Sequence, residues 1–192
     1  MPNMHILVFI TLALKFAVAM PQFDRAANYR TRNVIDKPWE LAQFDLDPFN
    51  LTHMCVDCKK DNRDPLFGCS IKFTWSDPNA NQSCTCNESW QWDGVTTTQG
   101  SLNNYSTSYL VCKDNKAELF QFKIMDIFDL SNFSLSLTHM YHDSKDFPTS
   151  TIVNMFAQPN ITLQMVEKSN ISMTYSSPPD SSIEANITGM TI

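Results

Sequence analysis

The stretch Phe133-Ser-Leu-Ser-Leu-Thr-His-Met-Tyr141 decides the fold class of this chain. Every second position is apolar, aromatic or histidine, and the residues between them include Ser134, Ser136 and Thr138. Successive side chains of a β-strand point to opposite sides, so this period of two indicates a strand that buries one face. The stretch therefore predicts a strand that carries Leu135, Leu137 and His139 on its buried side.

The same alternation recurs in short segments on both sides of this strand. One such segment is 69–75, and the turn signal Asp77-Pro78-Asn79 follows it. Mixed spacing also fits a helix at 118–128, but the aromatic and β-branched content favours a strand. About eight or nine short strands predict an all-β fold, an antiparallel sandwich or barrel linked by disulfides. The remaining strand candidates are 39–44, 109–112, 120–124, 152–156, 161–165 and 171–175.

The N-terminus has the features of a secretory signal peptide. The apolar run Ile6–Leu14 ends at Lys15, and the small residues Ala17 and Ala19 fit a cleavage site before Met20. A membrane-spanning helix needs about 20 apolar residues, so this run is too short to be an anchor. We therefore expect a secreted, extracellular protein without a membrane anchor.

The chain divides by composition into four parts. Residues 1–19 are the expected signal peptide, and the polar residues 20–37 form a flexible leader. A single β domain is expected over 38–175. The tail 176–192 contains Pro178-Pro179 and many serines and threonines, which offer little apolar surface to bury, so we expect it to be disordered.

Cysteines and glycosylation sequons agree with export. Six cysteines remain after the signal peptide, and an even number in an exported chain is typical of a disulfide framework. Eight Asn-x-Ser/Thr sequons would accept N-linked glycans in a eukaryotic secretory pathway. The cysteines are Cys55, Cys58, Cys69, Cys84, Cys86 and Cys112, and the sequon asparagines are Asn50, Asn81, Asn87, Asn104, Asn132, Asn160, Asn170 and Asn186. Asn132, Asn160 and Asn170 fall on the polar side of their strands, so a sugar there would leave the sheet.

Charge and composition exclude several classes of function. The chain has 14 basic and 20 acidic residues, and loss of Lys15 with the signal leaves a mature chain of charge about −7. No basic patch interleaved with aromatic residues is present, so nucleic acid is not an expected partner. With only four glycines, the chain has no phosphate-binding glycine-rich loop.

Cys55-Val-Asp-Cys58 is the sharpest chemical motif. A Cys-x-x-Cys pair can serve as a redox dithiol, or it can bind zinc with Cys69, Cys84 and Cys86 as further ligands. Structural disulfides are the favoured interpretation, because the expected compartment is oxidising.

Other candidate groups do not converge in the sequence. His139, His142, Asp143 and Asp146 gather near one strand end, yet parity directs His139 inward and His142 outward. A core histidine with one hydrogen-bond partner is therefore favoured over a metal ligand. No motif of a hydrolase or metalloprotease is present, and we predict no catalytic residue, metal or cofactor. A pair of glycosidase-type carboxylates stays open, because such residues need no proximity in sequence.

Three tryptophans could stack on a sugar ring or close the core, and the core is favoured for most aromatic residues at such positions. Trp90 and Trp92 share one parity, and we expect a strand end to bury one and expose the other. Trp92, in the loop 87–94, is our candidate surface-binding residue, and Trp90 and Trp75 are expected in the core.

Five short motifs follow one another between Trp39 and Met165. They are Trp39-Glu-Leu-Ala-Gln-Phe44, Phe73-Thr-Trp-Ser-Asp-Pro78, Cys86-Asn-Glu-Ser-Trp90, Tyr109-Leu-Val-Cys112 and Leu137-Thr-His-Met-Tyr-His-Asp143. Their order resembles a fungal family of small secreted proteins, named for the major allergen of Alternaria. The resemblance implies a compact β-sandwich or barrel, a disulfide like Cys86–Cys112, extracellular release and a role at a host surface. It carries over no catalytic residue.

Cys55, Cys58, Cys69 and Cys84 depart from that family's pattern. If Cys86 pairs with Cys112 as the resemblance implies, Cys84 would pair with Cys69 from the neighbouring strand. Cys55 would then pair with Cys58 or with a cysteine of a partner chain. The second alternative would make the protein a homodimer.

Together these features predict a secreted, N-glycosylated interaction or effector-like module. Its partner would be an extracellular protein or glycan, including one of host origin. Two alternatives stay open. One is a secreted hydrolase or thiol redox enzyme that uses Cys55 and Cys58 or an unidentified carboxylate pair, and the other is a cell-wall structural glycoprotein.

Overall fold

A computed structural model of the chain describes residues 41, 44–113, 119–145 and 152–192. The chain separates into a unit Met1–Pro38, which lies outside the described residues, and a unit Trp39–Ile192, whose fold follows. The expected signal peptide and leader, and Asp146, are therefore outside the described part. Leu41 and Phe44, from the segment predicted as the first strand, are not in a strand, and the Phe44 amide donates to the Leu41 carbonyl at 3.0 Å.

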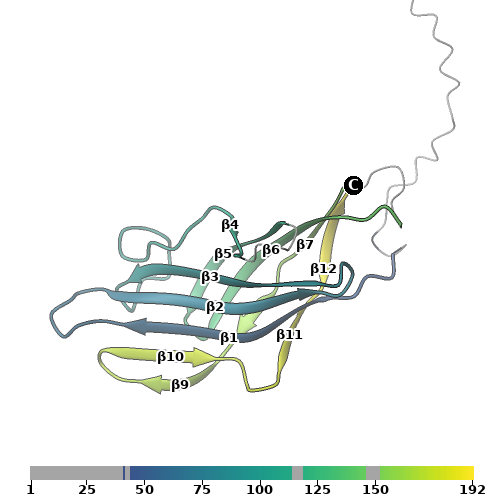
Figure 1. Ribbon diagram of the computed structural model, residues 1–192. Helices are drawn as coiled ribbons and strands as arrows, with labels where there is room; N and C mark the ends of the chain where they lie inside the picture. The colour runs from purple at the N-terminus through teal and green to yellow at the C-terminus, as the bar shows by residue number, and fades with distance from the viewer. Residues whose placement is uncertain (1–40, 42–43, 114–118, 146–151) are drawn as a thin grey trace, which may run out of the picture. The chain divides into compact units, whose positions relative to one another are not determined.

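The described residues form two antiparallel sheets, which confirms the predicted all-β sandwich (Figure 1). Sheet A has the order β3-β2-β1-β10-β9, with β11 also paired to β1. Sheet B has the order β12-β7-β6-β5-β4, with β8 also paired to β6. The strands are β1 Phe49–Lys59, β2 Phe67–Asp77, β3 Gln82–Trp92, β4 Leu110–Val111, β5 Leu119–Asp129, β6 Asn132–His142, β7 Ile152–Ala157, β8 Asn160–Thr162, β9 Gln164–Lys168, β10 Ser172–Ser176, β11 Ser182–Ala185 and β12 Ile187–Thr191.

The core lies between the sheets and is built by alternating side chains. The strand predicted from 133–141 is β6, and its odd-numbered residues are buried as expected. Trp75 of β2 is fully buried and packs edge-on against Phe49 of β1 and Phe120 of β5, with ring centroids 5.1 and 4.8 Å apart. Aromatic pairs in this geometry stabilise a core beyond their buried area. Trp75 therefore joins the two sheets.

Strand β1 changes phase in its middle. Phe49 and Leu51 are buried before the change, and Cys58 is buried after it, so the buried positions shift from odd to even numbers. His53 has a φ of 53°, and the pairing of β1 with β2 shifts between Thr52 and Cys55, as in a β-bulge. Because a slip of one residue exchanges the two faces of a strand, Cys55 lies on the outer face and Cys58 points inward.

The prediction that residues 176–192 form a disordered tail is wrong. Its first residue ends β10, and the segment then forms β11, which pairs with β1, and β12, which pairs with β7. Ala185 is buried, and Ile187 and Met190 pack against the core. Backbone pairing with both sheets satisfies the polar groups of a segment whose own apolar content is small.

The single strand predicted for 161–165 is also wrong. The segment divides into β8, in sheet B, and β9, in sheet A, with the buried Leu163 between them. The Leu163 amide donates to the Ser131 carbonyl at 2.7 Å, which fixes the crossing point. All five residues of β9 are exposed, including Met165. In the part of the chain that the structure describes, no helix is long and apolar enough to cross a membrane.

Candidate functional site

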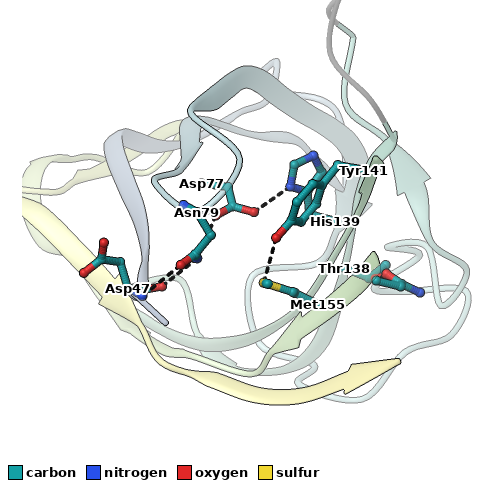
Figure 2. Close-up of polar contacts among 8 residues, drawn as sticks. Asp47, Asp77, Asn79, Thr138, His139, Tyr141 and Met155 are labelled. Carbon is teal, nitrogen blue, oxygen red and sulfur yellow. Dashed lines mark hydrogen bonds and ion pairs between the residues drawn. The ribbon is translucent and has the colours of Figure 1, made fainter. Parts of the chain in front are cut away.

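His139 and Asp77 form a buried polar pair between the sheets (Figure 2). His139 Nδ1 lies 2.7 Å from Asp77 Oδ2, and both side chains are 0% exposed. Asp77 Oδ1 accepts hydrogen bonds from the backbone and side-chain nitrogens of Asn79. The His139 ring stacks on Phe120 and Tyr141, with centroids 3.7 and 5.0 Å away.

This geometry confirms the expectation of a core histidine with one partner. His142, predicted to point outward, is exposed and does not join the pair. Asp77 is on β2 and His139 is on β6, so the pair links the two strands. Because both side chains are buried, the pair is not placed to receive a substrate.

Two disulfides are present, and one of the expected pairings is confirmed. Cys86 is joined to Cys112, as the family resemblance implies. The second disulfide joins Cys58 to Cys69, so the pairings Cys69–Cys84 and Cys55–Cys58 are wrong. Cys55 and Cys84 belong to neither disulfide of the chain. The alternative that Cys55 pairs with a partner chain stays a prediction.

Strand register explains the corrected pairing. Cys58 lies directly opposite Cys69 in the β1–β2 pair, with Cα atoms 4.0 Å apart. In the β2–β3 pair, Cys84 lies opposite Trp75, six positions from Cys69 and thus about 20 Å along the strand. The length of the turn after Asp77 sets this register. The position of that turn in the sequence could therefore have excluded the Cys69–Cys84 disulfide.

The Cys-x-x-Cys motif does not form a dithiol. Cys58 is already in a disulfide, and Cys55 lies on the opposite face of β1. Burial raises the pKa of the Cys55 thiol, the nearby Asp57 charge raises it further, and Lys59 opposes both. A thiol with a raised pKa is a weaker nucleophile at neutral pH.

The inward side of β3 carries cysteine, glutamate and tryptophan side chains in one row. Its residues Cys84, Cys86, Glu88, Trp90 and Trp92 alternate along the strand, and all are buried. β3 is an edge strand of sheet A, and the Cys86–Cys112 disulfide ties it to the residue that follows β4, the edge strand of sheet B. This disulfide closes one edge of the sandwich.

Both tryptophans of β3 are buried, so the prediction that Trp92 lies on the surface is wrong. Trp90 and Trp92 are each 6% exposed. The Trp92 indole Nε1 donates to the Thr96 carbonyl at 2.7 Å, and its ring lies beside Phe67 of β2, with centroids 6.4 Å apart. No bulge separates them, because β3 pairs with β2 without a register shift.

Trp92 instead braces the long connection from β3 to β4, which we call the 93–109 loop. Asn103, fully buried, donates from Nδ2 to the same Thr96 carbonyl at 2.9 Å. Asp93 accepts hydrogen bonds from the Thr96 amide, the Thr96 hydroxyl and the Val95 amide, which together lower the pKa of its carboxyl. Gly94 has a φ of +91°, a backbone conformation that glycine adopts readily.

Glu88 is a functional group that the sequence reasoning missed. Its carboxyl is buried among the apolar and sulfur side chains of β3, and Oε1 accepts the Ser106 amide hydrogen at 2.6 Å. Among the described residues, nothing hydrogen-bonds to Oε2. Burial raises the pKa of Glu88, and the Ser106 hydrogen bond opposes that shift. The alternation of β3 itself places Glu88 inward and could have identified it.

We expect Glu88→Gln to stabilise the fold at neutral pH. Because folding raises the pKa of Glu88, stability is greatest below the ordinary value of 4.5 and decreases as the pH rises through the interval up to the raised value. Glutamine keeps an acceptor for Ser106 and has no proton to lose. Urea unfolding between pH 4 and 7 should show a flatter pH dependence for this variant, while exposed Glu184→Gln should keep the wild-type slope. Equal slopes for the wild type and Glu88→Gln would contradict the assignment.

The sequon asparagines lie mainly on the surface. The predicted outward direction is confirmed for Asn132 and Asn160, which are exposed in β6 and β8. Asn170 is also exposed, but it lies between β9 and β10 and not in a strand. Asn104, in the 93–109 loop, is exposed while its Oδ1 accepts the Gln91 amide, which leaves Nδ2 as the glycan attachment atom. Asn50 is half-buried, and the exposed remainder are Asn81, Asn87 and Asn186.

A separate depression lies at the end of sheet A that carries the β1–β2 loop. It has a volume of about 700 Å³ and surrounds the β1–β2 loop, where Lys59, Lys60, Asp61 and Asp64 line it. It contains none of the cysteines, tryptophans or histidines that the sequence singled out.

The fold and the site define a class of protein, a disulfide-linked antiparallel β-sandwich with a braced loop along one edge. No protein-family model, curated protein or solved structure matches the chain. The relationship to the Alternaria allergen family therefore stays a prediction.

Proposed function

We propose that this protein is a secreted, N-glycosylated interaction module that binds an extracellular protein or glycan through its 93–109 loop. The observation that carries the proposal is that hydrogen bonds to Thr96 from Trp92 and Asn103 tie the loop to the sandwich, while the loop displays apolar side chains. Val95 is 81% exposed and Leu102 is 49% exposed. Binding costs less when the loop is already ordered, and apolar anchors on a rigid scaffold are typical of interaction surfaces.

Three further features support this proposal. The two disulfides suit an oxidising compartment, and seven of the eight sequon asparagines are exposed. The motif order that resembles the fungal allergen family favours an extracellular role, including one at a host surface. The buried position of the His139–Asp77 pair favours binding over acid–base catalysis by these residues.

The first part of the test concerns export. Expressed as the full chain in a eukaryotic secretory host, the protein should enter the medium, begin near Met20 and lose mass on treatment with an N-glycosidase. Recovery of an uncleaved, sugar-free chain from the cytosol would contradict the secretory part of the proposal.

The second part concerns the loop. A Val95→Lys/Leu102→Lys variant should lose at least tenfold in affinity for any member of a panel of immobilised extracellular glycans and secreted proteins that the wild type binds, because buried anchors dominate such interfaces. The matched control is Met165→Lys/Val166→Lys on β9, which changes two exposed apolar residues far along the chain. Equal losses in both variants would contradict binding through the loop. Turnover of a glycan by the wild type that Asp61→Asn or Asp64→Asn abolishes would favour the hydrolase alternative.

A further inference from the structure

Three sulfur atoms meet inside the edge of the sandwich that the disulfide closes. Cys84 Sγ lies 3.7 Å from Cys86 Sγ, and the Sγ atoms of Cys84, Cys86 and Cys112 all lie within 4.8 Å of one another. Cys84 and Cys86 point to the same side of β3 because they are two residues apart on a strand. Cys84 is a thiol, and the other two form a disulfide. A thiol in contact with a disulfide has the composition that thiol–disulfide exchange requires.

We propose that these residues form an internal exchange site, in which Cys84 attacks Cys86 and releases Cys112. The Cys84 thiol loses its proton to solvent, and the resulting thiolate attacks Cys86 Sγ. The Cys84–Cys86 bond forms as the Cys86–Cys112 bond breaks, and the Cys112 thiolate takes up a proton. One disulfide replaces another, so the step needs no external oxidant or reductant. Cys84 is 2% exposed, so a thiol or disulfide in solution cannot easily reach it. The neighbouring disulfide is therefore the favoured target of its attack.

The exchange changes what the disulfide constrains. Cys86 and Cys112 are 26 residues apart, and the chain between them contains the whole 93–109 loop. A Cys84–Cys86 bond encloses almost no chain, and the disulfide between the edges of sheets A and B is lost. The end of the loop would then be held by β4, a strand of two residues that pairs with β5 at Leu110 and Val111. The exchange therefore releases one end of the loop. This inference does not depend on the loop being a binding surface.

Alkylation of the native, fully folded protein tests the proposal. N-ethylmaleimide added at pH 8 should label Cys112 and leave a Cys84–Cys86 disulfide, because the reagent traps the released thiol. Acid quenching, digestion with pepsin at low pH and mass spectrometry would locate the label and the bond, provided that cleavage falls between Glu88 and Leu110. The rate should increase about tenfold per pH unit while Cys84 is mostly protonated, since the thiolate is the attacking species. It should be independent of protein concentration.

Matched variants separate this reaction from other labelling. Cys84→Ser should abolish labelling of Cys112 and keep the Cys86–Cys112 bond, whereas Cys55→Ser should leave labelling of Cys112 unchanged. Cys112→Ser should be secreted with a Cys84–Cys86 disulfide. Label on Cys84 with Cys86–Cys112 intact would overturn the proposal, and so would the absence of label on Cys112 after prolonged exposure. A labelling rate that rises with protein concentration would also overturn the proposal. This test uses the wild-type protein, so it holds even if a variant fails to fold.

Discussion

Replacing Asp77 by alanine is expected to lower the free energy of unfolding by about 3–5 kcal/mol, the range for removing one partner of a buried pair. The substitution leaves His139 without its hydrogen-bond partner in a region that water does not reach. It also removes the acceptor for two hydrogen bonds from Asn79, which shape the turn between β2 and β3. The loss therefore acts on the link between the sheets and on the register of the β2–β3 hairpin.

Urea unfolding followed by tryptophan fluorescence would measure this loss, because Trp75 lies in the same part of the core, with its ring centroid 6.3 Å from that of His139. The matched control is Asp47→Ala. Asp47 contacts Asn79 only through its backbone, where its amide donates to Asn79 Oδ1 and its carbonyl accepts from Nδ2 (Figure 2). Its exposed side chain should therefore be worth less than about 0.5 kcal/mol. A loss no larger for Asp77→Ala than for Asp47→Ala would show that the buried pair contributes little.

Alternation predicted the strands well where a strand keeps one phase. The regular pattern of β2 and β6 placed their inward side chains correctly, including His139. The sequence pattern did not reveal where the buried side of a strand changes from odd to even positions. At His53 the buried side of β1 shifts by one residue, and this shift places Cys58 opposite Cys69, where the register before the bulge would have placed Asp57. A bulge depends on the pairing of two strands, so no pattern in β1 alone indicates it.

Composition misled where pairing supplies the stability. The tail from 176 contains prolines and hydroxyl residues, and such a sequence cannot bury enough apolar surface by itself. It forms strands because β1 and β7 each offer a free backbone edge, which is a property of the assembled sheets. Glu88 was missed for the opposite reason. Acidic side chains usually lie on the surface, while the alternation of β3 places Glu88 in the interior.

Trp92→Ala is expected to cost about 3–5 kcal/mol and to reduce the secreted yield sharply, because truncating a buried tryptophan opens a cavity. The indole fills the space beside Phe67 and anchors the loop through the Thr96 carbonyl. Trp92→Phe separates these contributions, since it keeps most of the packing and loses the hydrogen bond, for a cost nearer 1 kcal/mol. Val95→Ala is the control within the same loop, and its exposed side chain should leave stability unchanged.

The two readouts of this series distinguish support of the loop from direct contact with a partner. If the loop binds through Val95 and Leu102, Val95→Ala should weaken binding without affecting thermal unfolding. Trp92→Phe should do the reverse, lowering the unfolding temperature while the folded fraction still binds. A Trp92→Ala protein that is secreted and unfolds like Val95→Ala would contradict the buried position of the indole. It would also return Trp92 to the surface role that the sequence first suggested.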